Sequence, residues 1–213
     1  MRLRELYREW LFPHVTRWCL TGRALGRERQ AALAGVQGEV LEVGFGSGLN
    51  LPFYPMTVTR LVAVDCSRTA VRLAAPRIAS APFTVDVQIH SGEALPFVAE
   101  TFDSVVFTWT LCMIDDPLTA LSEARRVLRP AGQLFFLEHG RADDPALARS
   151  QDRWNPLNQR LFAGCNINRP IDALVSAAGF DIRSLDRYQR RGPRVSSCVY
   201  RGVAVKIAAP EAH

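Results

Sequence analysis

Three glycines at alternate positions, Gly44, Gly46 and Gly48, follow an apolar run that contains Glu42. Glycines at this spacing let the backbone turn tightly and approach a ligand at the carboxyl end of a strand. A dinucleotide fingerprint requires G-x-G-x-x-G, and Leu49 stands where its third glycine belongs. The Glu42 carboxylate would repel a pyrophosphate but suits a ligand with an ammonium group. The segment therefore predicts such a ligand, and the alternative is a plain strand-to-helix turn.

Asp65 ends the next β-branched run, 21 residues after Gly44. This is close to the spacing of the acid that binds ribose in nucleotide-binding α/β folds. Its two oxygens can accept hydrogen bonds from both ribose hydroxyls. Asp65 could instead cap the following helix, but Ser67 is better placed for that role. We therefore expect a ribose contact at Asp65.

The elements that position these residues follow a βαβ pattern, because short β-branched runs alternate with stretches of helical spacing. The expected strands are residues 40–43, 61–64, 85–89, 104–108, 133–137, 180–185 and 197–205, and helices are expected at 67–79 and 117–128. The last two strands leave no room for a long helix between them, which indicates an antiparallel pair at the sheet edge. The sequence thus predicts an α/β fold with a doubly wound, seven-stranded, mostly parallel sheet whose last strand is antiparallel. One domain is expected over residues 1–213.

The composition limits the classes of function. Five widely spaced cysteines without zinc-ligand spacing predict reduced thiols and no metal site. The sequence contains neither a signal peptide nor a run of about 18 apolar residues, so we expect a cytoplasmic protein. Seven arginines and three glutamates in residues 1–30 account for +4 of the net charge of +5. No nucleic-acid-binding motif accompanies them, which argues against a nucleic acid partner.

Residues 1–38 predict an amphipathic helical cap, in which basic residues alternate with Trp10, Leu11, Trp18 and other apolar residues. Three interpretations stay open. Such a segment can lie on an anionic membrane surface, so that the protein contacts the membrane peripherally. It can also cover an apolar substrate, or it can pack as a first helix against its own domain.

The glycine loop and Asp65, together with HSGEALPF and FTWTLCMIDDP, resemble the class I, type-11 methyltransferase family, which includes quinone-ring methyltransferases. The resemblance covers residues 40–137 and implies S-adenosylmethionine as the cofactor. It also implies a set of cofactor-binding residues: Glu42, Gly44, Gly46, Gly48, Asn50, Asp65, Cys66, Gly92, Glu93, Ala94 and Thr108.

A narrower resemblance extends over almost the whole chain. TLCMIDDP, RRVLRPAGQLFFLEHG, WNPLNQRLFAGCNINR and YRGVAVK are similar to the alkyl-thiol S-methyltransferase group and its prokaryotic relatives. This implies methyl transfer to a small-molecule acceptor, with a thiol as the first candidate. A thiol with a pKa of about 8.5 ionises appreciably and needs no strong base. The alternatives are a lipid-directed methyltransferase, acting on phospholipid nitrogen or quinone carbon, and an inactive regulator that binds the cofactor.

The acceptor is expected under the long stretch 140–170, an insertion at the carboxyl edge of the sheet. Trp109, Cys112, Trp154, Phe162 and Asn166 are the candidate residues of its pocket. The aromatics could equally be core residues, the asparagines turn residues and the thiols small apolar fillers. His139, at the end of the fifth strand, is the candidate catalytic residue, either as a general base or as an acceptor contact. Its alternative is a structural, hydrogen-bonded histidine.

Overall fold

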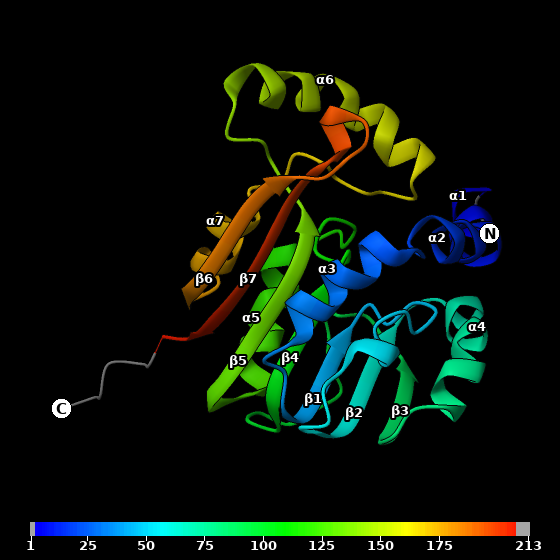
Figure 1. The fold of residues 1–213 in the computed structure, drawn as a ribbon, viewed down its shortest axis with the longest axis vertical. Helices are drawn as coiled ribbons and strands as arrows, with labels where there is room; N and C mark the ends of the chain where they lie inside the picture. The colour runs from blue at the N-terminus through cyan, green and yellow to red at the C-terminus, as the bar shows by residue number, and fades with distance from the viewer. Residues whose placement is uncertain (1–2, 208–213) are drawn as a thin grey trace.

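The computed structural model describes residues 3–207 and contains one sheet of seven strands, in the order β3-β2-β1-β4-β5-β7-β6 (Figure 1). The strands are β1 (Gly38–Val43), β2 (Val58–Asp65), β3 (Thr84–Ile89), β4 (Phe102–Thr108), β5 (Leu128–His139), β6 (Phe180–Gln189) and β7 (Cys198–Lys206). Strands β1 to β5 pair in parallel. Strand β7 lies antiparallel between β5 and β6. The predicted seven strands and antiparallel last strand are confirmed.

Helices cover both faces of this sheet. They are α1 (Leu3–Leu6), a π-helical turn (Tyr7–Leu11), α2 (Phe12–Cys19), α3 (Arg23–Leu33), α4 (Arg68–Ala79), α5 (Pro117–Val127), α6 (Pro145–Leu161) and α7 (Ile171–Ala177). Helices α5 and α7 bury residues such as Leu121 and Val175 against one face. Helices α3 and α4 bury Leu33 and Ala74 against the other. Alternate strand residues supply the two cores, because successive side chains of a strand point to opposite faces.

The two predicted helices begin where their capping residues stand. The Ser67 side chain accepts a hydrogen bond from the Ala70 backbone N–H and starts α4. Asp116 accepts from the backbone N–H groups of Leu118 and Thr119, and Pro117 occupies the first turn of α5. These caps satisfy N–H groups that have no partner within the helix.

The stretch 140–170 folds mainly into α6, which lies above the carboxyl ends of the parallel strands (Figure 1). The π-helical turn and α2 lie at the same end of the molecule and contact α4, whereas α3 lies along the sheet (Figure 1). The carboxyl edge of the sheet therefore has two covers, one from each of these segments.

Within residues 3–207, none of the helices combines the length and the apolar character that crossing a bilayer requires.

Candidate functional site

A cavity of about 370 Å³ opens at the carboxyl ends of β1, β2 and β4. Open α/β sheets bind ligands at this edge. Its lining includes Glu42, Gly44, Gly46, Asn50, Asp65, Cys66, Gly92, Glu93 and Thr108 from the expected cofactor set. Gly48 and Ala94 belong to the same set but do not line the cavity. Gly48 instead packs closely, since a Cβ there would lie 3.2 Å from side-chain atoms of both Leu51 and Phe45.

The glycine loop needs its glycines for two different reasons. Gly44 has a φ of +79°, and a Cβ there would lie 2.2 Å from Thr110 Oγ1, so the loop packs directly on the β4 side. Gly46 has a φ of +58°, but a Cβ there would meet nothing within 4 Å. Left-handed backbone of this kind favours glycine. Gly46 therefore keeps open the space in front of the loop.

Asp65 links the glycine loop to the start of α4. One carboxylate oxygen accepts from the Gly46 backbone N–H and the other from the Ser67 backbone N–H, each at 2.7 Å. Burial raises the pKa of Asp65 above its ordinary value, against these two hydrogen bonds. A carboxylate has about four acceptor sites, so both oxygens can also accept from a ligand hydroxyl.

Glu42 is buried at the floor of the cavity in a chain of polar side chains. It accepts from Asn50 Nδ2 at 2.8 Å and from the Tyr54 hydroxyl at 2.7 Å. Asn50 Nδ2 also donates to Thr108 Oγ1, and Arg29 Nη1 donates to Asn50 Oδ1 at 2.7 Å. Burial raises the pKa of Glu42 to about 7, although its hydrogen-bond partners and Arg29 act in the opposite direction.

Arg29 and Tyr54 complete this chain but were not among the sequence candidates. Arg29 comes from α3 and lines the cavity, and only 4% of it is exposed. In the sequence, Arg29 is one of seven arginines within residues 1–30. Nothing in its immediate sequence distinguishes it from Arg23 and Arg27, which are exposed. Its role depends on the packing of α3 against the sheet.

A smaller cavity of about 170 Å³ adjoins the first and shares with it the lining residues Phe12, Thr16, Leu20, Trp109 and Met113. Its remaining lining includes the apolar Val15, Phe162 and Ile167, three cysteines, among them Cys112 and Cys165, and the polar His139, Asn158 and Ser196. No aspartate or glutamate is found among the described residues that line it. The structure therefore brings together four of the expected acceptor-side residues: Trp109, Cys112, His139 and Phe162.

Trp109 lines both cavities and is unusual in its backbone conformation and in its hydrogen bonding. Its φ is +56°, in a region that side-chain-bearing residues rarely adopt. Its indole Nε1 is the one buried side-chain nitrogen or oxygen within residues 3–207 that has no hydrogen-bond partner. Buried polar groups are normally paired, so this unpaired N–H is an exception between the two cavities.

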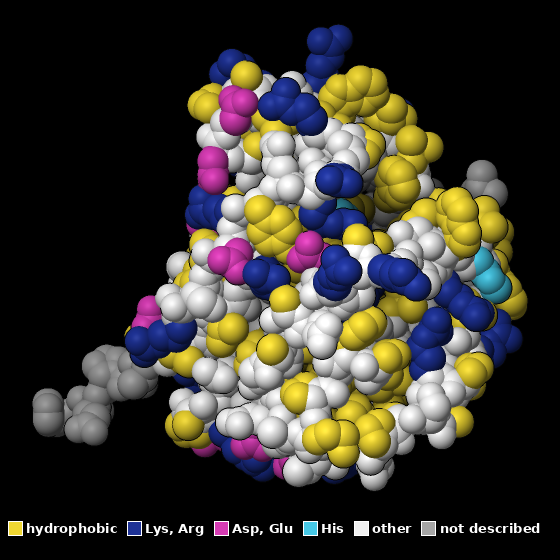
Figure 2. Space-filling view, viewed as in Figure 1, with side chains coloured by type: hydrophobic (Ala, Val, Ile, Leu, Met, Phe, Trp, Pro, Cys, Tyr) yellow, Lys and Arg dark blue, Asp and Glu magenta, His cyan; other side chains and the backbone are white. Residues whose placement is uncertain are grey.

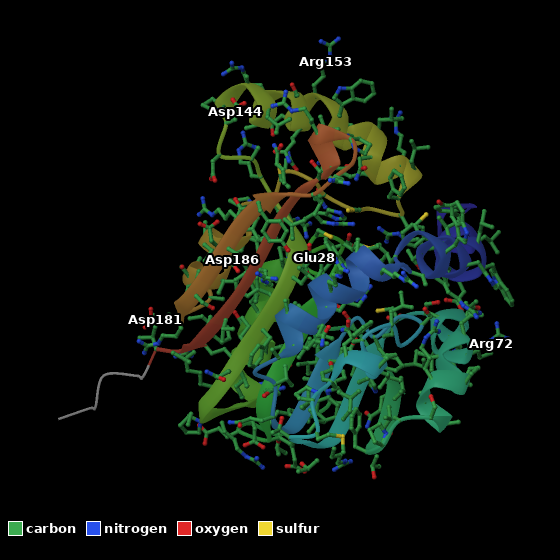
Figure 3. All side chains as sticks on the ribbon, viewed as in Figure 1. Glu28, Arg72, Asp144, Arg153, Asp181 and Asp186 are labelled. Atoms are coloured by element: carbon green, nitrogen blue, oxygen red, sulfur yellow. The ribbon has the colours of Figure 1, made fainter. Side chains whose placement is uncertain are left out.

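Two expected acceptor residues lie outside both cavities. Trp154, on α6, is 52% exposed and lines neither cavity, and its sequence neighbour Arg153 points away from the sheet (Figure 3). Asn166 acts within the protein instead. Its backbone N–H and Nδ2 both donate to the Cys112 carbonyl, and its Oδ1 accepts from Asn155 Nδ2 and Gln159 Nε2. It thus fastens the loop after α6 to the segment after β4.

The N-terminal segment closes the cavities from above. The Tyr7 hydroxyl donates to the Leu161 carbonyl at 2.7 Å, and Arg8 Nε donates to the Ala163 carbonyl at 2.8 Å. Glu9 accepts from the Thr69 backbone N–H at the start of α4. Phe12 and Pro13 are buried beneath, whereas Trp18 is 83% exposed. The inner face of this segment packs on its own protein, and its outer face carries exposed aromatic side chains.

Comparison with known proteins defines the class. The model of the methyltransferase domain family matches residues 41–136. The chain is 32% identical over 170 residues to the human thiol S-methyltransferase TMT1A (73% of this chain, 66% of that protein). It is 30% identical over 141 residues to the phosphatidylethanolamine N-methyltransferase of Cereibacter sphaeroides (62% and 69%). It is 34% identical over 128 residues to the ubiquinone/menaquinone biosynthesis C-methyltransferase UbiE of Syntrophotalea carbinolica (58% and 53%).

The chain thus spans about half to seven tenths of the length of these relatives. Among solved structures, a SAM-dependent methyltransferase from Aquifex aeolicus has the same fold, with a TM-score of 0.66 at 17% identity. That match covers 92% of this chain and 98% of the other. The chain belongs to the class I S-adenosylmethionine-dependent methyltransferases and carries their methyltransferase domain. The family and the fold predicted from the sequence are confirmed.

The residues around the larger cavity fit the cofactor of this family. S-adenosylmethionine carries an ammonium group, a carboxylate, a ribose and a sulfonium. Glu42 offers a buried negative charge for the cationic groups, and Asp65 offers acceptors for hydroxyls. The space in front of Gly46 is open.

Proposed function

We propose that this protein transfers the methyl group of S-adenosylmethionine to a small apolar thiol. The observation that carries the proposal is the smaller cavity, which adjoins the larger one and is lined mainly by apolar and sulfur-containing side chains, with His139 among the few polar ones. Its described lining lacks a carboxylate that could act as a base. A thiol needs less help from a base than a hydroxyl, because a small fraction is thiolate near neutral pH and the thiolate is strongly nucleophilic.

The cofactor, when bound, supplies a methyl group on a positively charged sulfur. In this proposal Glu42 and the glycine loop hold the amino acid part, and Asp65 holds the ribose. Cys66, Gly92 and Glu93 border the adenine, and Thr108 borders the sulfonium. The protein's main task is then to align the acceptor and to exclude water. The roof formed by Tyr7, Arg8 and the end of α6 serves the second task.

An acceptor screen tests this proposal. Production of S-adenosylhomocysteine is followed with alkyl thiols, phenols, quinols and phospholipid vesicles. We expect turnover with alkyl thiols. Turnover of phenols alone would overturn the thiol assignment, and binding of the cofactor without any turnover would favour an inactive regulator.

Two aromatic residues provide a matched pair for the acceptor side. Phe162 lines the smaller cavity and is 44% exposed, whereas Trp154 lies outside it and is 52% exposed. Phe162→Ala should raise the KM for an apolar thiol about tenfold, since about 1.5 kcal/mol of apolar contact is lost. Trp154→Ala should leave it unchanged. Equal effects of both changes would remove the smaller cavity from the acceptor site.

A lipid-directed methyltransferase is the second candidate, and one observation favours it. Large apolar side chains are exposed on both covers of the site: Trp10, Leu11 and Trp18 on one, and Trp154, Leu157, Leu161 and Phe162 on the other. Figure 2 shows hydrophobic side chains gathered over α6 and over the N-terminal helices. Exposed apolar patches of this kind mark binding to other molecules or to membranes. Sedimentation with vesicles that contain phosphatidylethanolamine and an anionic lipid, together with headgroup methylation, tests this candidate.

A further inference from the structure

Two thiols and one imidazole meet in the wall of the smaller cavity. Cys112 follows β4, His139 ends β5 and Cys165 follows α6, so three separate segments supply them. Their side chains lie close together: Cys112 Sγ is 3.7 Å from Cys165 Sγ, and His139 Nδ1 is 3.8 and 3.7 Å from the two sulfurs. We refer to these three residues as the Cys–His–Cys cluster.

These distances can be compared with those of a metal site. A tetrahedral Zn²⁺ ion with bonds of about 2.3 Å to sulfur and about 2.1 Å to nitrogen holds two sulfurs about 3.8 Å apart, and sulfur and nitrogen about 3.6 Å apart. The cluster has 3.7 Å between its sulfurs and 3.7 to 3.8 Å between sulfur and nitrogen. A disulfide would require the sulfurs to approach to about 2.05 Å. The spacing suits a shared ion better than a covalent bond between the thiols.

We propose that Cys112, His139 and Cys165 bind a soft divalent cation, Zn²⁺ in the first instance, with a fourth ligand position open to the smaller cavity. Thiolate and imidazole are the ligands that zinc prefers in proteins. Two thiolates and a neutral imidazole would also neutralise the charge of the ion, which lowers the cost of burying it. All three residues line the cavity, so the open position faces the space where an acceptor would bind.

The surrounding hydrogen bonds hold the cluster in shape. Asn166 ties the Cys112 carbonyl to the loop after α6, and Asn158 Nδ2 donates to the Cys165 carbonyl at 2.8 Å. Glu138 accepts from the backbone N–H groups of Thr110, Leu111 and Cys112. Hydrogen bonds around the ligands orient them and tune a metal site. The site is therefore built into the fold and does not depend on mobile surface residues.

The open position deepens the proposed function, on which this step rests. An acceptor thiol that binds the ion does so as a thiolate and gives up its S–H proton to solvent. Its sulfur keeps the electron pair that forms the new S–CH₃ bond while the S–CH₃ bond of the sulfonium breaks, and S-adenosylhomocysteine leaves. The product thioether is a weak ligand and dissociates. Zinc would thus favour the thiolate form of the acceptor without a general base on the protein.

Metal content is the first test and needs no substrate. The protein, purified under reducing conditions and dialysed against Zn²⁺, should hold about one equivalent by elemental mass spectrometry. Cys112→Ser, Cys165→Ser and His139→Gln should each reduce the content at least tenfold. Cys198→Ser changes another buried thiol, outside the cluster, and should retain it. Circular dichroism checks the fold of each variant.

The wild-type protein provides a test that does not depend on the variants folding. Co²⁺ in place of Zn²⁺ should give the intense thiolate-to-metal absorption of a tetrahedral site. A small alkyl thiol, added without S-adenosylmethionine, should change this spectrum. Absence of stoichiometric metal in the wild type, or equal loss in Cys198→Ser, would overturn the site. A normal cobalt spectrum that no thiol changes would leave the metal site standing and overturn only its part in thiol binding.

Discussion

The proposed cofactor side and the proposed acceptor side of this protein are built from different kinds of sequence. Glu42, Gly46 and Asp65 come from one continuous stretch, in which β1, the glycine loop and β2 follow each other directly. The acceptor side draws Cys112, Cys165 and the N-terminal helices from distant parts of the chain. The first side rests on main-chain geometry and the second on tertiary packing, so mutations should affect the two separately.

The largest effect is expected at Gly46. In Gly46→Val the side chain would enter the open space in front of the loop, and the residue would be strained at a φ of +58°. We expect cofactor affinity to fall at least a hundredfold, measured by calorimetric titration. Gly192→Val is the matched control, since Gly192 also has positive φ and open surroundings but lies outside both cavities. Normal affinity in Gly46→Val would show that the loop does not border the ligand.

Asp65 tests the same side through a polar contact. Asp65→Ala removes the acceptors of the Gly46 and Ser67 N–H groups and, in our proposal, of the ribose hydroxyls. We expect cofactor binding to weaken about tenfold to a hundredfold, equivalent to about 1.5 to 3 kcal/mol. The dissociation constant is compared with that of Asp186→Ala, a change at an exposed acid on β6. A folded Asp65→Ala protein with wild-type affinity would contradict the ribose assignment.

Nine of the eleven residues that the sequence suggested for cofactor binding line one cavity, and the reason is physical. Glycine spacing, a strand-ending acid and helix caps are local features, and parallel strands bring their carboxyl ends to one edge. The Cys–His–Cys cluster was not predictable in this way. Its three members are separated by 27 and 26 residues in the sequence and show no zinc-ligand spacing. Asn166 and Trp154 also show the limit. Their types suit a pocket, but only packing decides which face of the segment points inward.

Asn166 provides a test in which the proposed acceptor side is changed and the proposed cofactor side is left intact. Asn166→Ala leaves Asn155 Nδ2 and Gln159 Nε2 without their acceptor and removes one of the two hydrogen bonds to the Cys112 carbonyl, while the backbone N–H still donates to it. We expect the free energy of unfolding in denaturant to fall by about 1 to 3 kcal/mol. Asn168→Ala, which removes only an exposed bond to Asp152, should cost about 0.5 kcal/mol or less. Cofactor affinity should stay within twofold of wild type, and a larger loss would mean that the two sides are coupled.

The smallest expected effect is that of pH, which should change cofactor affinity and folding stability in opposite directions. The pKa of Glu42 is raised from 4.5 to about 7 by burial. An acid whose pKa is raised in the folded state stabilises that state at low pH. This contribution is fully present below pH 4.5 and is lost as pH rises through about 7. Glu138 is raised to about 7 in the same way, so both residues contribute to the stability change.

Cofactor binding should show the other sign, because the ammonium group is attracted only to ionised Glu42. With a pKa of about 7, roughly a tenth of Glu42 is ionised at pH 6 and roughly nine tenths at pH 8. Affinity should therefore rise by up to about tenfold between these values. In Glu42→Gln, titrations should show no rise in cofactor affinity between pH 6 and pH 8. Part of the loss of folding stability should remain, because Glu138 is unchanged. A binding slope that persists in Glu42→Gln would assign the titrating group elsewhere in the cofactor cavity.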